Sequence, residues 1–135
     1  MVSQAIKARN DYLRGRRLET GDGCPVDLVF AAYFYRRAAL RGLAEAQHAL
    51  GFLYATGQGV TLNETMAVHW FEAAARQNQV SAQHNLGVMY AEGRGVPRNE
   101  EIAVRWFYQA ALGGSAEARE WLARCEPGQA IGNNP

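Results

Sequence analysis

Apolar residues recur along the chain at the three- and four-residue spacing of an α-helix, in segments separated by glycine-containing breaks. In the first clear segment, Ala46, Leu50 and Leu53 fall on one face of such a helix, and the pattern stops at 57–59. A second apolar face follows over 67–75, where alanines and aromatic residues recur at helical spacing. The pattern therefore predicts two amphipathic helices joined by a short loop.

This two-helix pattern returns with a period of 36 residues. Residues 44–79 and 80–115 align without a gap and share 18 identities in 36 positions, and a degenerate copy occupies 8–43. The start of a fourth copy predicts a single closing helix over 115–125. Units of this length bury their apolar faces by stacking, which predicts one all-α domain over 1–126, an α-solenoid of about seven helices. Residues 127–135 are rich in Gly, Pro and Asn, and we expect them to form a disordered tail.

Glycine and asparagine recur where the helices should begin, end and touch. Gly57 is placed to end the first helix of its unit in the left-handed conformation, where a Cβ is unfavourable. Asn63, like Asp27 and Asn99 in the other copies, is placed to cap the second helix. Gly51 lies inside a helix, where glycine costs about 1 kcal/mol relative to alanine. We therefore expect the backbone of the paired helix to pass close to Gly51.

The repeated residues resemble the Sel1-like repeat, a relative of the tetratricopeptide repeat. The matching run is Ala-x-Ala-x-x-x-Leu-Gly-x-x-Tyr-x-x-Gly-x-Gly-Val, followed by Ala-x-x-Trp-Phe-x-x-Ala-Ala, and it is nearly complete at 46–75 and 82–111. Members of this family are typically adaptors in bacterial signalling, secretion and envelope biology, or in endoplasmic-reticulum quality control. The resemblance therefore implies a protein–protein interaction module.

In tetratricopeptide-type solenoids the first helix of each repeat lines the concave surface, and the resemblance implies the same arrangement here. The groove positions are then those on the first helices that the core stripe does not use. The strip they form is basic and aromatic at one end, lined by histidines in the middle and acidic at the other. We expect a bound segment to place its acidic part towards Arg9 and Arg16. The expected partner-binding residues are Arg9, Tyr12, Arg16, Glu45, His48, Phe52, Ser81, His84, Val88, Glu117, Glu120 and Arg124, with Tyr12 and Phe52 as the apolar anchors.

Residues that could carry catalysis or hold a cofactor are scarce. None of the three serines is followed three positions later by a lysine, as a Ser-x-x-Lys nucleophile requires, and the only lysine is Lys7. We predict neither enzymatic activity nor a cofactor. His48 and His84 recur on adjacent first helices, but no cysteine or acid recurs beside them. Groove residues are therefore a better interpretation of these histidines than metal ligands.

Charge is unevenly distributed along the chain, and surfaces other than the concave groove could also bind a partner. The net charge is +1, but residues 1–43 carry +4 and residues 44–135 carry −3. Arg36, Arg37 and Arg41 should lie on the convex side of the first unit, either as a solvated face or as a contact for an acidic protein or a nucleic acid. A second copy of the chain could instead stack on the open end of the last unit. Trp121 could cap the closing helix or contact a partner.

The distribution of apolar runs indicates the cellular compartment of the protein. No apolar run approaches the roughly 20 residues of a membrane helix. The first 17 residues contain charged side chains and no continuous apolar core of a secretory signal. We expect a cytoplasmic protein, with the periplasm as the alternative for a chain that has lost a leader.

Overall fold

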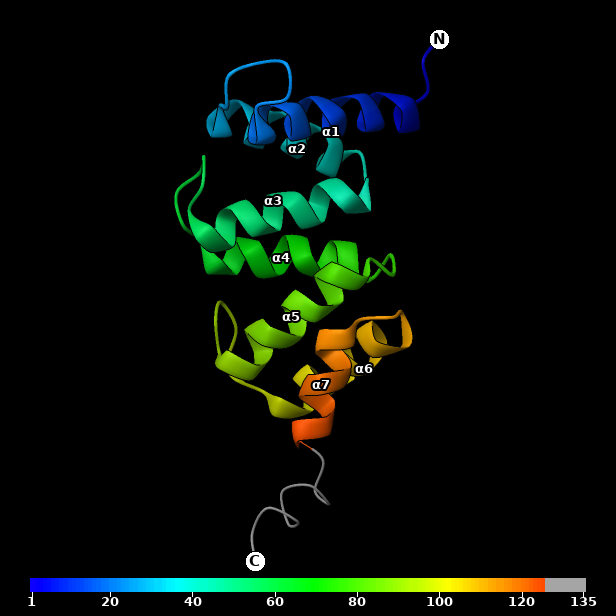
Figure 1. Cartoon of the computed structure of the whole chain (residues 1–135), viewed down its shortest axis with the longest axis vertical. Coiled ribbons are helices and arrows are strands. Elements are labelled where there is room, and N and C mark those ends of the chain that lie inside the picture. Colours follow the sequence, from blue (N-terminus) through cyan, green and yellow to red (C-terminus); the bar gives the residue numbers. More distant parts are fainter. Residues whose placement is uncertain (126–135) are drawn as a thin grey trace, which may run out of the picture.

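The protein is a stack of helices, described over residues 1–125 by a computed structural model (Figure 1). Over this range it contains seven helices and no strand, which confirms the predicted all-α solenoid. The predicted closing helix is present, whereas the predicted tail at 127–135 lies outside the described residues. The helices are α1 (Gln4–Thr20), α2 (Leu28–Leu40), α3 (Ala44–Thr56), α4 (Glu64–Ala75), α5 (Val80–Glu92), α6 (Glu100–Leu112) and α7 (Ala116–Cys125).

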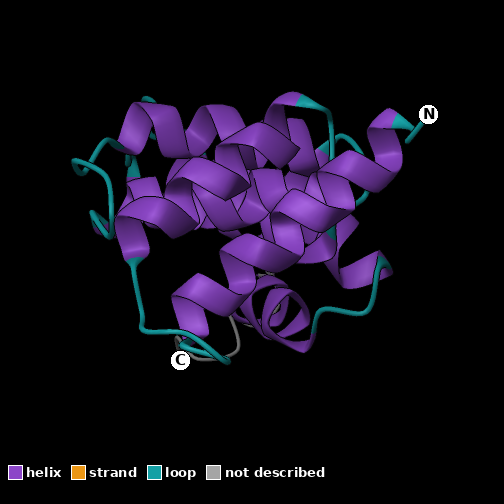
Figure 2. Ribbon diagram, turned by 90° about the horizontal axis from the view of Figure 1, so that it is seen from above, coloured by secondary structure: helices purple, strands orange, loops and turns teal. Residues whose placement is uncertain are grey.

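Each repeat contributes an antiparallel helix pair, and the pairs follow one another along the long axis of the molecule (Figure 1). Within a repeat α1 packs on α2, α3 on α4 and α5 on α6, and the second helix of each repeat also packs on the first helix of the next. Seen down the long axis, the helices overlap in one compact projection (Figure 2). Within the described residues, none of these helices has the length and apolar character needed to cross a membrane.

The loop between the two helices of a repeat is determined by the recurring glycine and asparagine residues. Gly57 ends α3 with φ 68° and ψ 34°, and its N–H donates to the carbonyl of Leu53. The side chain of Asn63 accepts a hydrogen bond from the N–H of Met66 at the start of α4. The equivalent residues in the other two repeats make the equivalent contacts, so both predictions are confirmed. Gly59 has a different role, because a Cβ there would collide with the carbonyl of Leu28 in the preceding repeat.

The glycine inside α3 meets an aromatic ring of the paired helix, and the backbone of that helix also passes close to it, as expected. A Cβ on Gly51 would lie 2.7 Å from Cδ1 of Phe71 and 3.3 Å from the carbonyl oxygen of Ala67. Gly15 and Gly87 meet the rings of Tyr35 and Phe107 in the same way. The ring therefore fills the space next to the glycine, and the two helices of each repeat are held in register by this contact.

Three hydrophobic clusters form the core, and each of the first two joins neighbouring repeats. Trp70 is 8% exposed and packs with residues of α2 and α3, while Trp106 is half-buried against residues of α4 and α5. Both tryptophans are therefore structural, as their register predicts. Trp121 stacks on Phe107 with ring centroids 4.2 Å apart, so it covers the end of the third cluster. Of the two interpretations of Trp121, the structure favours the cap.

Candidate partner-binding groove

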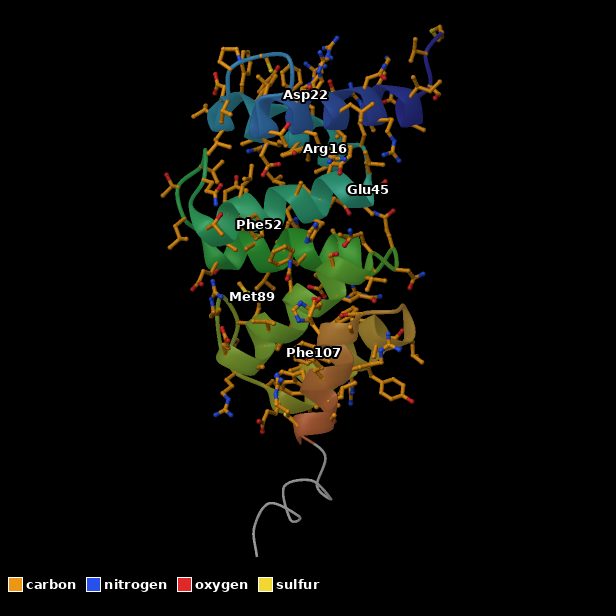
Figure 3. The ribbon with its side chains drawn as sticks, in the orientation of Figure 1. Arg16, Asp22, Glu45, Phe52, Met89 and Phe107 are labelled. Carbon is orange, nitrogen blue, oxygen red and sulfur yellow. The ribbon has the colours of Figure 1, made fainter. Side chains whose placement is uncertain are left out.

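The first helices of the repeats and the closing helix line two adjoining hollows on one side of the solenoid. The larger has a volume of about 570 Å³ and is bounded by α3, α5, the loop before α7 and the start of α7. The smaller, of about 380 Å³, lies between α1 and α3. Figure 3 shows Arg16 on α1 above Glu45 and Phe52 on α3. The expected groove residues that line the larger hollow are His48, Phe52, Ser81, His84 and Glu117, and those that line the smaller are Tyr12, Arg16, Glu45, His48 and Phe52.

Phe52 lies at the centre of this surface. It lines both hollows and also a third, of about 130 Å³, together with Val88. Phe52 is 44% exposed, and the equivalent positions of the other repeats hold Arg16 and Val88, neither of which is buried. The structure thus places an accessible apolar side chain where the two hollows meet.

The two histidines of the groove each rest on an aromatic ring of their own repeat. The ring of His48 lies 5.8 Å from that of Phe71, and the ring of His84 lies 5.6 Å from that of Phe107. Burial lowers the pKa of His48 below its ordinary value, and Nε2 of His48 lies 3.0 Å from the side-chain amide nitrogen of Asn85. That amide donates to Nε2 in the neutral tautomer of the imidazole that carries its proton on Nδ1. Within residues 1–125, no three histidine, cysteine or acidic side chains gather as a metal site would require.

The basic end of the expected strip is partly neutralised within the protein. Arg9 pairs with Glu45 at 2.9 Å and lies over the ring of Tyr12. The pKa of Glu45 is lowered, first by its own N–H at the start of α3 and then by Arg9. Arg16 lines the smaller hollow and is exposed. Arg16 is therefore accessible in the smaller hollow, whereas Arg9 is engaged in an ion pair between α1 and α3.

Sequence reasoning missed several residues that shape the groove. Tyr35 of α2 reaches the smaller hollow and donates a hydrogen bond of 2.6 Å to Glu19. Burial, together with this bond, raises the pKa of Tyr35 far above its ordinary value. Asn85 and the glycines between α6 and α7 line the larger hollow. Asn85 could have been found, because its repeat-equivalent positions hold Ala49 and Trp121 and the repeat therefore does not require it.

Four expected residues line neither of the two hollows, namely Arg9, Val88, Glu120 and Arg124. Arg9 lines a separate hollow near the start of α1, together with Ile6 and Leu43. Glu120 and Arg124 are exposed on α7 but line neither hollow. The candidate groove is thus shorter than the strip expected from the sequence.

The arginines on the second helix of the first repeat also differ from the expected solvated face. Asp11 of α1 is 4% exposed and pairs with Arg41 at 2.6 Å and with Arg37 at 3.3 Å. Arg41 also donates to the side chain of Gln4. Because Arg41 is committed to these contacts, the outer basic surface that could meet an acidic protein or a nucleic acid is smaller than its sequence suggests.

The chain belongs to the Sel1 repeat family. The model of the Sel1 repeat matches residues 12–43, 44–79 and 80–115, which are the three helix pairs of the solenoid. Proteins built from this repeat generally mediate protein–protein interactions and are typically non-enzymatic scaffolds. Among proteins with curated descriptions, none matches the sequence.

Similar solved structures support the same assignment. The antigen c5321, a protective antigen present in uropathogenic Escherichia coli strains and displaying an SLR fold, is 37% identical with a TM-score of 0.84. The match covers 85% of this chain and 25% of that antigen, so the chain spans about a quarter of its length. A Sel1 repeat protein from Oxalobacter formigenes is 35% identical with a TM-score of 0.79, over 86% of this chain and 87% of that one. Cysteine rich protein B of Helicobacter pylori shares the fold, at 22% identity and a TM-score of 0.72 over 84% and 87% of the two chains.

Proposed function

We propose that the protein is an adaptor that binds a segment of a partner protein in the groove lined by α1, α3, α5 and α7. The observation that carries the proposal is that two adjoining hollows share His48 and Phe52 and so form one continuous surface across three repeats. A surface that extends over α1, α3, α5 and the start of α7 suits an extended peptide segment better than a small molecule, because apolar and polar side chains from several helices line it.

Phe52 is the anchor of this interaction. It is exposed at the junction of the hollows, where an apolar side chain of the ligand can pack on it and lose contact with water. Ser81 and Asn85 lie beside it on α5 and carry groups that can hydrogen-bond to a peptide backbone. The apolar contact would supply most of the affinity, and the polar groups would position the ligand.

The charges at the two ends of the groove give the ligand a direction. Arg16 lies in the hollow at the α1 end and Glu117 in the hollow at the α7 end. An acidic part of the ligand is therefore directed towards α1 and a basic part towards α7. This orientation rests on Arg16 alone, because Arg9 is paired with Glu45.

The test is capture of partners from a native lysate with immobilised protein and its Phe52→Ala variant. Phe52→Ala should abolish capture while lowering the free energy of unfolding by about 1 kcal/mol or less, because nearly half of the side chain is exposed. Tyr12→Ala is a poorer test, since Tyr12 is half-buried and packs on Tyr35. The matched control is Tyr108→Ala on α6, which removes an aromatic side chain that is 57% exposed and outside the groove. Equal capture by Phe52→Ala and the unmodified protein would contradict the proposal.

A further inference from the structure

In the second and third repeats, a tryptophan of the second helix contacts the preceding repeat. Trp70 of α4 joins the core cluster that contains the buried residues of α2, and Trp106 of α6 packs on the cluster that contains the buried residues of α4. Met66, one turn before Trp70, packs on the same cluster of the first repeat. Large apolar side chains at these positions therefore join one helix pair to the pair before it.

The first repeat carries aromatic residues at the same positions without such a contact. Phe34 is equivalent to Trp70 and Phe30 to Met66, yet neither belongs to any of the three core clusters of the described residues. Phe30 is 51% exposed. Their rings lie 5.5 Å apart, and the ring of Tyr33 lies 5.2 Å from that of Phe34. Phe30 is thus open to solvent and Phe34 is only partly buried, although the equivalent residues of the second repeat pack in the core.

The adjoining outward positions of α2 are also more apolar than their equivalents. Val29 is 70% exposed and Tyr33 is 49% exposed. Together with Phe30 and Phe34 they form what we call the α2 aromatic face. An exposed cluster of large apolar side chains on one face of a repeat indicates a contact surface. The residues equivalent to Val29 and Tyr33 are Thr65 and His69 in α4, and Glu101 and Arg105 in α6.

Two arginines lie beside the α2 aromatic face and favour a negatively charged ligand. The guanidinium of Arg14 lies 5.7 Å from the ring centre of Phe34, and that of Arg37 lies 5.7 Å from that of Tyr33. Among the described residues Arg14 makes no ion pair, and the carboxylate that pairs with Arg37 is the buried Asp11. Residues 1–43 carry a net charge of +4. Two copies joined through this face would bring the two sets of arginines together, so charge disfavours a second copy as the occupant.

We propose that the α2 aromatic face is a second docking surface, distinct from the groove, for an acidic amphipathic helix of a partner protein. The apolar side of that helix packs on Phe30 and Phe34. This contact would resemble the packing of Trp70 and Trp106, each of which lies against the repeat before its own. Its carboxylates pair with Arg14 and with the outer edge of Arg37. This proposal does not depend on the groove, because the face lies on α2 and the groove is lined mainly by the first helices.

The test uses a fluorescent peptide of about 18 residues with leucine at helical i, i+3, i+4, i+7 spacing and glutamate elsewhere. Binding is followed by fluorescence anisotropy and located by the amide shifts of α2. Phe30→Ser and Arg14→Glu should each weaken binding by about tenfold or more. Tyr108→Ser, which alters an exposed aromatic residue of α6, should leave binding unchanged. A matched peptide with lysine in place of glutamate should not bind.

Several results would overturn the proposal. Equal binding by Phe30→Ser, or equal binding of the lysine peptide, would show that neither the aromatic face nor its charge is responsible. Loss of peptide binding in Phe52→Ala, with Phe30→Ser unaffected, would place the peptide in the groove. A dimer detected by light scattering and dissolved by Phe30→Ser would make a second copy the occupant. Sedimentation with phosphatidylserine vesicles that depends on Phe30, without peptide binding, would make it a membrane surface.

Discussion

Arg41→Gln is expected to destabilise the protein more than Asp11→Gln, although the two residues form one ion pair. The pair is asymmetric, because the side chain of Asp11 is 6% exposed whereas that of Arg41 is 25% exposed. Removing Arg41 leaves a buried carboxylate with only the longer, 3.3 Å contact to Arg37. Removing Asp11 leaves an arginine that can reach water and the side chain of Gln4. The uncompensated charge is thus more costly in the first variant.

The expected losses of stability follow from the burial of each partner and from the equivalent pair in the second repeat. Removing one partner of a fully buried ion pair costs about 3–5 kcal/mol, and the remaining contact with Arg37 reduces this to about 2–3 kcal/mol for Arg41→Gln. Asp11→Gln should cost about 1 kcal/mol, because the arginine it leaves is partly solvated. In the second repeat the equivalent residues are Gln47 and Gln77, which are joined by a neutral hydrogen bond of 2.9 Å. The double variant Asp11→Gln/Arg41→Gln reproduces this glutamine pair in the first repeat. Its free energy of unfolding should lie within about 0.5 kcal/mol of that of the unmodified protein.

Urea unfolding followed by circular dichroism measures all four proteins, and a common slope with denaturant shows that the same transition is compared. Arg37→Gln is the matched control. Its pair with Asp11 is longer and its side chain is 44% exposed, so its loss should be the least destabilising of the single substitutions. The reasoning is refuted if Asp11→Gln is at least as destabilising as Arg41→Gln, or if the double variant shows the sum of the two single losses.

Gly51→Ala should destabilise the protein by about 2 kcal/mol, measured by the same unfolding assay, because its Cβ would overlap the ring of Phe71. Helix propensity alone predicts a gain of about 1 kcal/mol, so an increase in stability would contradict the packing argument. The free energy of unfolding should also decline as pH falls through about 6.5. Burial gives His48 a lower pKa in the folded than in the unfolded protein, so the unfolded chain binds the proton more readily. His48→Gln should reduce this slope, and an unchanged slope in that variant would contradict the prediction.

Much of the fold was predictable because the same helix-capping and turn residues recur in all three repeats. Gly57 ends a helix and Asn63 begins one through contacts within a few residues of each, and such contacts can be inferred from sequence spacing. The glycine inside α3 was also recognisable as a close contact. Its contact with the ring of Phe71 was not, since that ring comes from the paired helix and its side-chain direction is set by packing.

The candidate groove was only partly predictable for a similar reason. Helical spacing identified Phe52 and His48 as residues that the core does not use, and both lie in the two hollows. It could not show that Arg9 is paired with Glu45, because those side chains meet across two repeats. It also could not place Glu120 relative to the hollows, since the position of α7 depends on how Trp121 stacks on Phe107.

Helix periodicity, capping residues and turn glycines act locally and recur at a fixed interval, so the repeat, the helices and the family could be inferred from the sequence. Which charges remain available at the surface depends instead on how the helices pack. Arg41 was drawn inward by the buried Asp11, and Phe30 was left uncovered on α2. Burial and pairing depend on which helix faces which, and a single helix does not carry that information.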